Sequence, residues 1–452
     1  MHTHTPAPDT AAAGPEPALL DLPAAVPACS PAAEAARPRL REVNRAQLQW
    51  RPLDLEAALP EDHRARIVWE YVEGLDLTPL YERILAVEGH AGRAATDPKI
   101  LFALWLMATI EGVGSARALE RLCDEHLAYQ WLCGGVSVNY HTLADFRTAH
   151  VEVLDALLTR SVASLLAEQL VELHRVAIDG MRVRASAGAA SFRRRPRLER
   201  CLVEAEAQVQ ALRAEVAADP AATTQRQRAA RARAAHERRA RVAHALAQWP
   251  AAAAKKPSAK QAETRVSTTD PEARVMKMAD GGFRPAYNVQ FATTTASQVI
   301  VGVDVDNEGS DNGHLVPMVD QLTARHGQPP AEVLADGGFV KLEALEAVSA
   351  TTCVYAPVPA PKDPTRDPHV PLPGDSPPIA AWRQRMGTPE AQAIYTHRAA
   401  TAECVNAQVR NRGLWQFLVR GLAKVRAVAL WHALAHNLRR AVALRAPAVA
   451  GP

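Results

Sequence analysis

The sequence has 452 residues, 48% of them hydrophobic and 22% charged, with a formal net charge of +3. This length and composition fit two to four globular domains. No run of about 18 uncharged apolar residues indicates a membrane span. The first 38 residues are rich in Pro and Ala and lack the segments of a signal peptide, so we expect a disordered tail and a cytoplasmic protein without a membrane partner.

Cysteines and histidines give little sign of a metal site. The six cysteines form no CxxC pair, and the sixteen histidines form no cluster with ligand spacing. The sequence therefore predicts neither a disulfide framework nor a zinc site.

The local charge is more informative than the net charge. Between Phe192 and Val242, thirteen arginines accompany six acidic residues. This stretch is either a solvated helical face or a surface that contacts nucleic-acid phosphates, since arginine neutralises backbone charge and releases counterions. The consecutive residues Arg193, Arg194 and Arg195 are candidate phosphate contacts.

Residues 39–173 have the pattern of a helical domain. An apolar helix is predicted over Ile100 to Ile110, and Ser115 is suited to cap the helix that follows it. Gly134 and Gly135 then interrupt the helical pattern.

After this break, Asn139 or Thr142 is expected to cap a further short helix. A helix, a glycine turn and a short helix with exposed side chains outline a helix-turn-helix, in which Asn139 and Arg147 would contact DNA. A plain helical hairpin has the same outline, so both interpretations stand.

From residue 174 to 444 strands and helices alternate. Strands over Tyr287 to Thr294 and Val299 to Val305 are expected to form a hairpin, and an amphipathic helix is expected over Leu315 to His326. Two inserts interrupt this order: an Arg-rich helical hairpin (192–260), with Ala251 to Lys260 as its linker, and a Pro-rich loop (357–394). Residues 445–452 form a tail. With the inserts removed, the order of elements fits a ribonuclease H-like α/β domain, in which helices flank a mixed sheet.

Two acidic residues end comparable strands. Asp179 ends Val176-Ala-Ile-Asp and Asp336 ends Val333-Leu-Ala-Asp, and a glycine follows each. An apolar strand of this kind carries a carboxylate to the edge of a sheet, and the glycine permits close approach of backbone and ligand. A plain Asp-Gly turn is the structural alternative at each position.

A third acidic residue, Glu403, lies in a predicted helix from Thr396 to Arg412. Arg410 follows it by seven residues and shares its helical face. Three converging carboxylates would suit two Mg²⁺ ions, or Mn²⁺ as a substitute, which can support in-line displacement at a phosphate. A surface Glu–Arg pair is the alternative.

Several motifs resemble bacterial insertion-sequence transposases of the DDE type, in particular insertion-sequence group 1182 within the assemblage of families 4 and 5. The resemblance spans about residues 45 to 442. The motifs that carry it are Thr96-Asp-Pro-Lys-Ile-Leu-Phe-Ala-Leu-Trp, Ile110-Glu-Gly-Val-Gly-Ser-Ala-Arg, Trp131-Leu-Cys-Gly-Gly-Val, Asp179-Gly-Met-Arg-Val-Arg-Ala, Tyr287-Asn-Val-Gln, Leu334-Ala-Asp-Gly-Gly-Phe and Arg420-Gly-Leu-Ala-Lys-Val-Arg.

The resemblance implies a catalytic and metal-binding triad of Asp179, Asp336 and Glu403. It also implies a Tyr/Arg/Glu/Lys signature at Tyr395, Arg398, Glu403 and Arg410, whose basic and tyrosine side chains would contact DNA. Two features depart from the family pattern. Arg410 replaces the usual lysine, and four residues separate Arg398 from Glu403 where three are common in related groups.

The sequence thus predicts a transposase that cleaves and joins double-stranded DNA at terminal inverted repeats and target DNA. We expect a homodimer on DNA, associated with the nucleoid, because two element ends must be paired. A domesticated or inactive derivative that only binds DNA, and a ribonuclease H-like nuclease without strand transfer, are the alternatives.

Overall fold

The computed structural model describes residues 54–86, 94–218 and 224–446, together with Ala46, Pro52 and Gly89. Contacts divide the chain after Pro52, and the elements below all lie in the second unit, Leu53–Pro452. The expected tail (1–38) lies outside the described residues, as do residues 447–452 and the pair Asp219-Pro220, which is expected to separate the two helices of the insert. No described helix is both long and apolar enough to cross a lipid bilayer.

The described residues before 174 form helices whose ends match the sequence signals. Asn139, as expected, caps its helix by accepting the backbone N–H of Thr142 at 2.9 Å. Ser115 caps the helix that follows it, and Gly134 ends another in the left-handed conformation (φ 56°). The helices are α1 (Arg64–Glu73), α2 (Thr78–Tyr81), α3 (Pro98–Ile110), α4 (Ala116–Glu125), α5 (Leu127–Cys133), α6 (Tyr140–Ala149) and α7 (Val151–Ala167).

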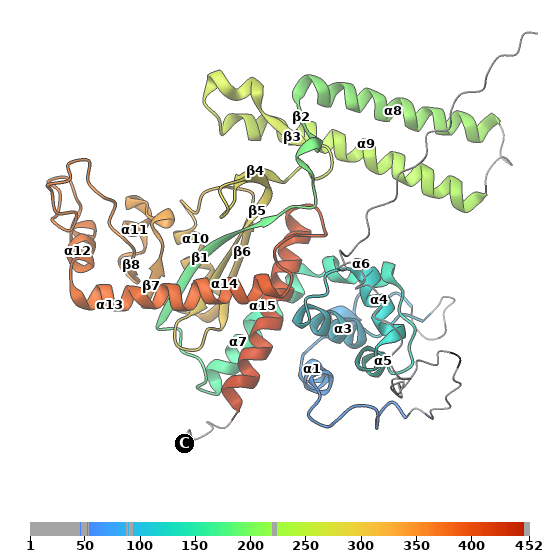
Figure 1. The fold of residues 1–452 in the computed structure, drawn as a ribbon, viewed down its shortest axis with the longest axis horizontal. Helices are drawn as coiled ribbons and strands as arrows, with labels where there is room; N and C mark the ends of the chain where they lie inside the picture. Colours follow the sequence, from blue (N-terminus) through green and yellow to red (C-terminus); the bar gives the residue numbers. More distant parts are fainter. Residues whose placement is uncertain are drawn as a thin grey trace, which may run out of the picture. The chain divides into compact units, whose positions relative to one another are not determined.

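A mixed sheet follows (Figure 1), with the strand order β4-β5-β1-β7-β8 and with β6 also paired to β5. β1 is antiparallel to β5 and parallel to β7, because helical crossovers lead to the later strands. The predicted hairpin of β5 and β6 is confirmed. The bounds are β1 (Arg175–Arg184), β4 (Arg274–Lys277), β5 (Phe283–Thr294), β6 (Ile300–Asp306), α10 (Leu315–His326), β7 (Glu332–Ala335), η3 (Gly337–Phe339), α11 (Leu342–Val348) and β8 (Cys353–Tyr355).

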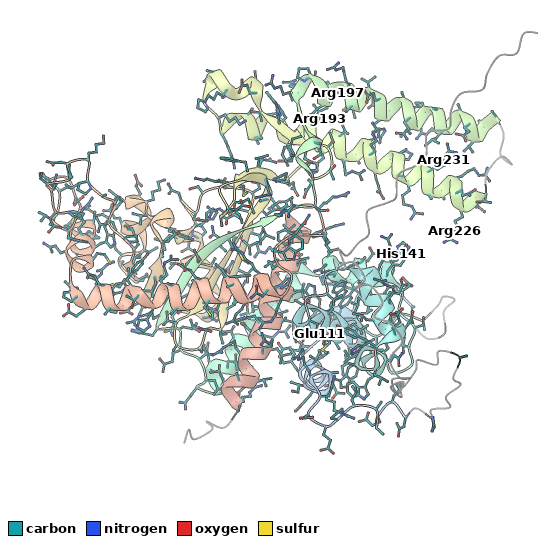
Figure 2. The ribbon with its side chains drawn as sticks, viewed as in Figure 1. Glu111, His141, Arg193, Arg197, Arg226 and Arg231 are labelled. Atoms are coloured by element: carbon teal, nitrogen blue, oxygen red, sulfur yellow. The ribbon has the colours of Figure 1, made fainter. Side chains whose placement is uncertain are left out.

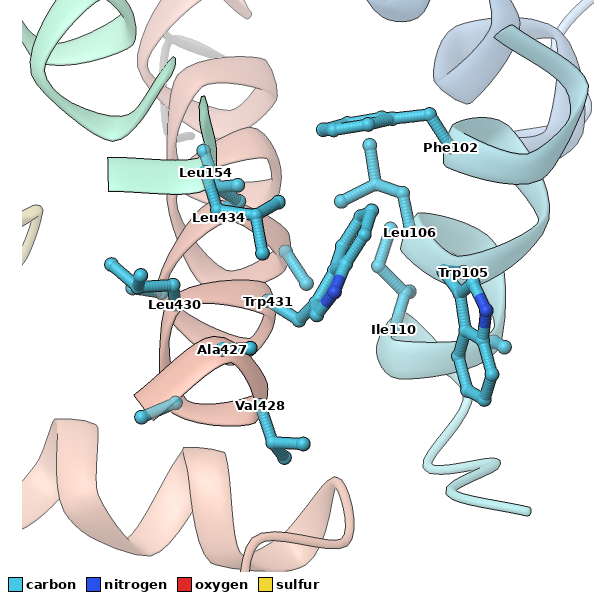
Figure 3. Packing of buried hydrophobic residues seen from close by; sticks show 14 of the residues in the cluster. Phe102, Trp105, Leu106, Ile110, Leu154, Ala427, Val428, Leu430, Trp431 and Leu434 are labelled. Atoms are coloured by element: carbon cyan, nitrogen blue, oxygen red, sulfur yellow. The ribbon is translucent and has the colours of Figure 1, made fainter. Parts of the chain in front are cut away.

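Helix α15 (Leu422–Arg445) joins the early helices to the sheet. Figure 3 shows Trp431 pointing from α15 toward Phe102 and Leu106 on α3. The rings of Trp431 and Phe102 are 4.6 Å apart, and Trp431 is only 1% exposed. On the same helix, the amide of Asn437 satisfies both backbone groups of Ile300 at the open edge of β6.

The Arg-rich insert is a pair of long helices, α8 (Arg195–Ala218) and α9 (Gln225–Ala254), which pack against each other (Figure 1). A short ladder of β2 (Phe192–Arg194) and β3 (Arg265–Ser267) closes its base; η1 (Ala189–Ser191) precedes it. The expected linker from Ala251 to Lys260 was wrong. α9 extends through Pro250 to Ala254, because alanine favours helix and Ala252 and Ala253 are buried, and η2 covers Ser258–Glu263.

The Pro-rich loop expected over 357–394 is also shorter than predicted. It ends before α12 (Pro377–Met386), which α13 (Pro389–Arg398) follows. In both helices proline occupies the first turn, where its missing N–H costs nothing and its fixed φ favours helix. α13 continues through a π-turn, η4 (Ala399–Glu403), into α14 (Cys404–Asn411).

Candidate active site

Asp179 and Asp336 lie next to each other because β1 and β7 run parallel. The last pair of this ladder is Ile178 with Ala335, so the two aspartates follow together. The expectation that Asp179 ends its strand was wrong. β1 continues to Arg184, paired with β5, whereas the parallel strand β7 ends at Ala335. Asp336 does end its strand, and its carboxylate accepts the N–H of Gly338 at 2.8 Å.

Glu403 is connected to this pair through Arg398. The guanidinium of Arg398 lies 3.0 Å from Oε1 of Glu403 and 3.5 Å from Oδ1 of Asp179. Asp179 and Arg398 are largely buried, whereas Glu403 is 58% exposed. The three predicted carboxylates do not all lie within 4.8 Å of one another. Two of them, Asp179 and Glu403, are connected by the positively charged guanidinium of Arg398.

The π-turn explains the unusual spacing of Arg398 and Glu403. In a regular α-helix, residues five apart point about 140° away from each other. A π-turn is closed by hydrogen bonds between residues five apart, so it accommodates one extra residue per turn. Because the turn spans Ala399–Glu403, the two side chains meet on one face despite the inserted residue.

Asn406 is a further site residue on the same helix to which sequence reasoning gave no role. Its side-chain N–H donates to Oδ2 of Asp179 at 2.9 Å, and only 6% of the residue is exposed. It follows Glu403 by three residues, so helical spacing could have indicated it. Tyr395 is half-buried beside Arg398, and burial raises the pKa of its hydroxyl. Arg410 is half-buried and pairs with no described carboxylate.

A fourth acidic residue, Asp311, lies beside Gly180 and Gly338, which come shortly after Asp179 and Asp336. It is 4% exposed, and it accepts hydrogen bonds from Arg182 at 2.9 Å and from Asn288 at 2.7 Å. A Cβ on Gly180 would lie 2.2 Å from its carboxylate, so only glycine fits there. The close approach that the sequence assigned to a ligand is therefore made, at Gly180, by a side chain of the protein.

The electrostatics of Asp179 favour a bound cation. Burial raises the pKa of its carboxyl to about 6; the negative charges of Asp336 and Asp311 raise it further, and Arg398 lowers it. Ionising Asp179 is thus costly until a positive charge compensates it. Oxygen donors of this kind suit Mg²⁺ or Mn²⁺.

We expect the affinity for Mn²⁺ to depend on pH with a midpoint near 6. Below that pH, Asp179 is protonated and must lose its proton before it can bind a cation, so affinity rises about tenfold per pH unit. Above it, affinity is flat. Titration calorimetry from pH 5 to 8 measures this profile. Asp179→Asn, which lacks the titrating group, should bind weakly and without the midpoint; an unchanged profile would contradict the assignment.

A separate cluster of acidic residues and a histidine lies on the other face of the sheet. Nε2 of His314 is 3.2 Å from Asp306, and Nδ1 is 3.9 Å from Asp304. Among the described residues it alone combines three such ligand atoms within 4.8 Å. Asp179 is in register with Phe291 and Val303, so the alternate residues Asp304 and Asp306 point away from its face.

The predicted DNA contacts outside the triad differ in exposure. Arg147 was expected on the surface and is 6% exposed, so that expectation was wrong. Its guanidinium lies 4.5 Å from the Trp105 ring and donates to the carbonyl of Gly114, and burial lowers its pKa to about 10. Asn139 is an exposed helix cap. Arg194 and Arg195 are exposed at the base of the hairpin, where Arg193 is half-buried.

Two family comparisons match this chain. A Transposase domain (DUF772) matches residues 53–149, and a Transposase DDE domain matches residues 377–442. The second stretch contains Glu403 and Arg398, and the first contains α1 to α6. No curated protein and no solved structure matches the chain.

The two matches indicate a transposase, and the mixed α/β fold fits that class of protein. More narrowly, the second match supports a bacterial transposase of the DDE class, a family that generally uses a divalent metal ion.

Proposed function

We propose that this protein cleaves and joins DNA at the terminal inverted repeats of an insertion sequence, with Mg²⁺ as its cofactor and with Asp179, Asp336 and Glu403 as the catalytic residues. One observation carries the proposal. Asp179 and Asp336 directly follow the last residue pair of the parallel strands β1 and β7, and Arg398 connects Asp179 to Glu403. We also propose that the element belongs to insertion-sequence group 1182.

The donor set fits the metal, since all three proposed ligands are carboxylates; burial raises the pKa of the Asp179 carboxyl, and the neighbouring carboxylates of Asp336 and Asp311 raise it further. Two bound Mg²⁺ ions would supply charge stabilisation for displacement at a phosphate. Asn406 fixes Oδ2 of Asp179 by a hydrogen bond, and Oδ1, which lies 3.5 Å from Arg398, is the oxygen that would bind the metal ion. Arg398, whose guanidinium lies between Asp179 and Glu403, is suited to bind a DNA phosphate.

We propose that two parts of the chain have separate functions, DNA-end recognition and catalysis. We propose that residues 39–173 are an all-helical domain that recognises the element end, and that α5 and α6 form its helix-turn-helix. Residues 174–444, without their insert, would then be a ribonuclease H-like domain. Its support is the antiparallel run β1-β5-β6 on one side of β1 and the parallel strands β7 and β8 on the other. We further propose a homodimer, which pairs two ends in the cytoplasm on the nucleoid.

A cleavage assay tests this function. A labelled duplex that carries the inverted repeats flanking the gene should be nicked at the element end in Mg²⁺ or Mn²⁺ and not in EDTA. A precleaved end with a free 3′-hydroxyl should then join to target plasmid. Binding without nicking in either metal would indicate a DNA-binding derivative, and nicking without joining would indicate a nuclease without strand transfer.

The hairpin of α8 and α9 offers a second DNA contact. Figure 2 labels Arg193 and Arg197 near its base and Arg226 and Arg231 farther along. Of the thirteen arginines between Phe192 and Val242, five pair with hairpin carboxylates. The other eight pair with no carboxylate among the described residues: Arg193, Arg194, Arg200, Arg213, Arg226, Arg228, Arg233 and Arg239. These unpaired cations are the proposed phosphate contacts.

Replacing Arg194, Arg200, Arg213 and Arg239 with glutamine should weaken binding to all DNA sequences alike. For every arginine that touches a phosphate, its replacement should reduce the slope of log K against log salt by about one. A charge-matched control replaces four paired arginines, Arg197, Arg231, Arg238 and Arg241, and should change the slope less. Filter binding between 50 and 300 mM salt (roughly the range in which counterion release is measured) distinguishes the sets; equal slopes in all three proteins would return the hairpin to a structural role.

A further inference from the structure

The turn between β5 and β6 contains a residue in an unusual backbone conformation. Gln298 has a φ of 55°, in the left-handed region. Among the described residues, Gln169 at φ 57° is the only other residue besides glycine with a positive φ. This conformation crowds the Cβ atom against the backbone, and glycine adopts it more easily. A glutamine held in this conformation is therefore a candidate for a role that needs its side chain.

The side chain of Gln298 reaches the π-turn on the proposed catalytic helix. Its Nε2 donates to the carbonyl of Ala400 at 3.2 Å. Ala400 lies inside η4, between Arg398 and Glu403, and η4 also packs against β1 and β5. Because π-turns are rare and regular helix is the usual conformation, a hydrogen bond from outside the helix helps to fix the turn.

Helix α15 fixes the backbone on which Gln298 lies. Nε2 of His436 is 2.7 Å from the carbonyl oxygen of Gln298. A carbonyl only accepts, so Nε2 carries the proton and donates it. His436 is 2% exposed, and burial lowers the pKa of its imidazole to about 4, which keeps the ring neutral. One turn farther along α15, Nε of Arg440 donates to the carbonyl of Ser297 at 2.8 Å. The turn is thus held in place and presents the amide of Gln298 to η4.

The conformation of η4 determines where Glu403 points. With regular α-helix over the same residues, the side chains of Arg398 and Glu403 would point about 140° away from each other. In the π-turn they meet at 3.0 Å, and Arg398 also lies 3.5 Å from Asp179. The bond from Gln298 fixes a carbonyl in the middle of the turn, so it opposes a return to regular helix.

We propose that Gln298 is a positioning residue of the active site, whose amide fixes the π-turn and thereby keeps Glu403 beside Arg398 and Asp179. Gln298 acts through Glu403 and contacts neither the metal ion nor the DNA. The inference rests on the proposed function, since Glu403 is a catalytic residue only there. Residues that orient a metal ligand in this way typically change affinity or rate by roughly 10–100-fold when they are replaced.

Two substitutions separate this role from a role in folding. Gln298→Gly removes the side chain but suits the left-handed backbone, so the protein should unfold at a similar urea concentration. Its single-turnover nicking rate on the inverted-repeat duplex in Mg²⁺ should fall at least about tenfold, whereas the Kd for the duplex should stay within about twofold. Gln298→Glu keeps the size of the side chain but, as a carboxylate, can only accept, so it should show the same loss.

Gln169→Gly is the matched control and should nick normally. Gln169 has the same backbone conformation just after α7, is exposed, and makes no side-chain hydrogen bond with any described residue. The comparison therefore removes a left-handed glutamine in both proteins and differs only in the bond to η4.

Binding of Mn²⁺ provides a readout besides activity. In titration calorimetry, Gln298→Gly should weaken Mn²⁺ binding by about tenfold. In a Glu403→Gln protein the same substitution should cause no further loss, because the carboxylate through which Gln298 acts is already absent.

The inference is overturned if Gln298→Gly nicks as fast as Gln169→Gly, if its rate falls only as far as its folded fraction, or if Gln298→Glu retains the rate. A further loss of Mn²⁺ affinity in the Glu403→Gln protein would also contradict it, because Gln298 would then act by another route. If the unaltered protein neither binds nor nicks the repeats, the proposed function fails, whereas the calorimetric comparison still tests the role of Gln298.

Discussion

Replacing Asp336 with asparagine should abolish DNA cleavage while the protein still folds and binds the inverted repeat. The amide has nearly the size of the carboxylate and can still accept the N–H of Gly338. It lacks the negative charge beside Asp179, so one proposed metal ligand is lost. Losing such electrostatic stabilisation lowers rates by roughly two or more orders of magnitude. A gel-shift assay and a parallel nicking assay in Mg²⁺ measure the two properties.

Asp320→Asn, which removes an exposed carboxylate from α10, is the matched control and should nick normally. A near-normal nicking rate for Asp336→Asn would show that the triad is misassigned. A variant that neither folds nor binds would instead show that Asp336 has a structural role.

Truncating Trp431 to alanine should destabilise the protein by about 3–5 kcal/mol, because a fully buried aromatic side chain leaves a cavity. The indole also donates to the carbonyl of Arg147 at 3.0 Å, and that acceptor would lose its partner. Urea unfolding measures the loss as a lower midpoint. Trp431→Phe should cost less, since it retains the contact with Phe102.

The exposed Trp415 is the natural control, because its truncation should change stability by less than about 0.5 kcal/mol. If Trp431→Ala and Trp415→Ala unfold at the same urea concentration, α15 does not hold the early helices as the packing indicates.

Elements with strong local signals could be predicted from the sequence. α10 was expected over Leu315 to His326 and has those bounds, because a clear apolar stripe ends at Gly327. β7 and its terminal aspartate likewise follow from four apolar-rich residues before an Asp-Gly-Gly turn. Residues whose role depends on distant contacts could not be found in this way. Asp311 is placed by Arg182 and Asn288, which lie on other strands.

The contact between Arg398 and Glu403 could not be predicted from their spacing in the sequence, because it depends on the π-turn. Glu403 follows Arg398 by five positions, and regular helical geometry would turn the two side chains apart. Backbone hydrogen bonding over Ala399–Glu403 brings them together, and no side-chain pattern in this alanine-rich stretch indicates it. The burial of Arg147 could not be predicted either. Its place in a short helix after a glycine turn suggested exposure, whereas packing against Trp105 and α15 buries it.

The packing of Trp431 on Phe102 also affects how the protein is made. On the ribosome, α3 emerges about 300 residues before the helix that covers it. At roughly 5–20 residues per second, its apolar face waits about 15–60 s for its partner. Trp105 is covered earlier, by α6, but Phe102 and Leu106 face Trp431 of α15 and stay uncovered in the nascent chain throughout that interval. The early helices can therefore complete their core only when synthesis is almost finished.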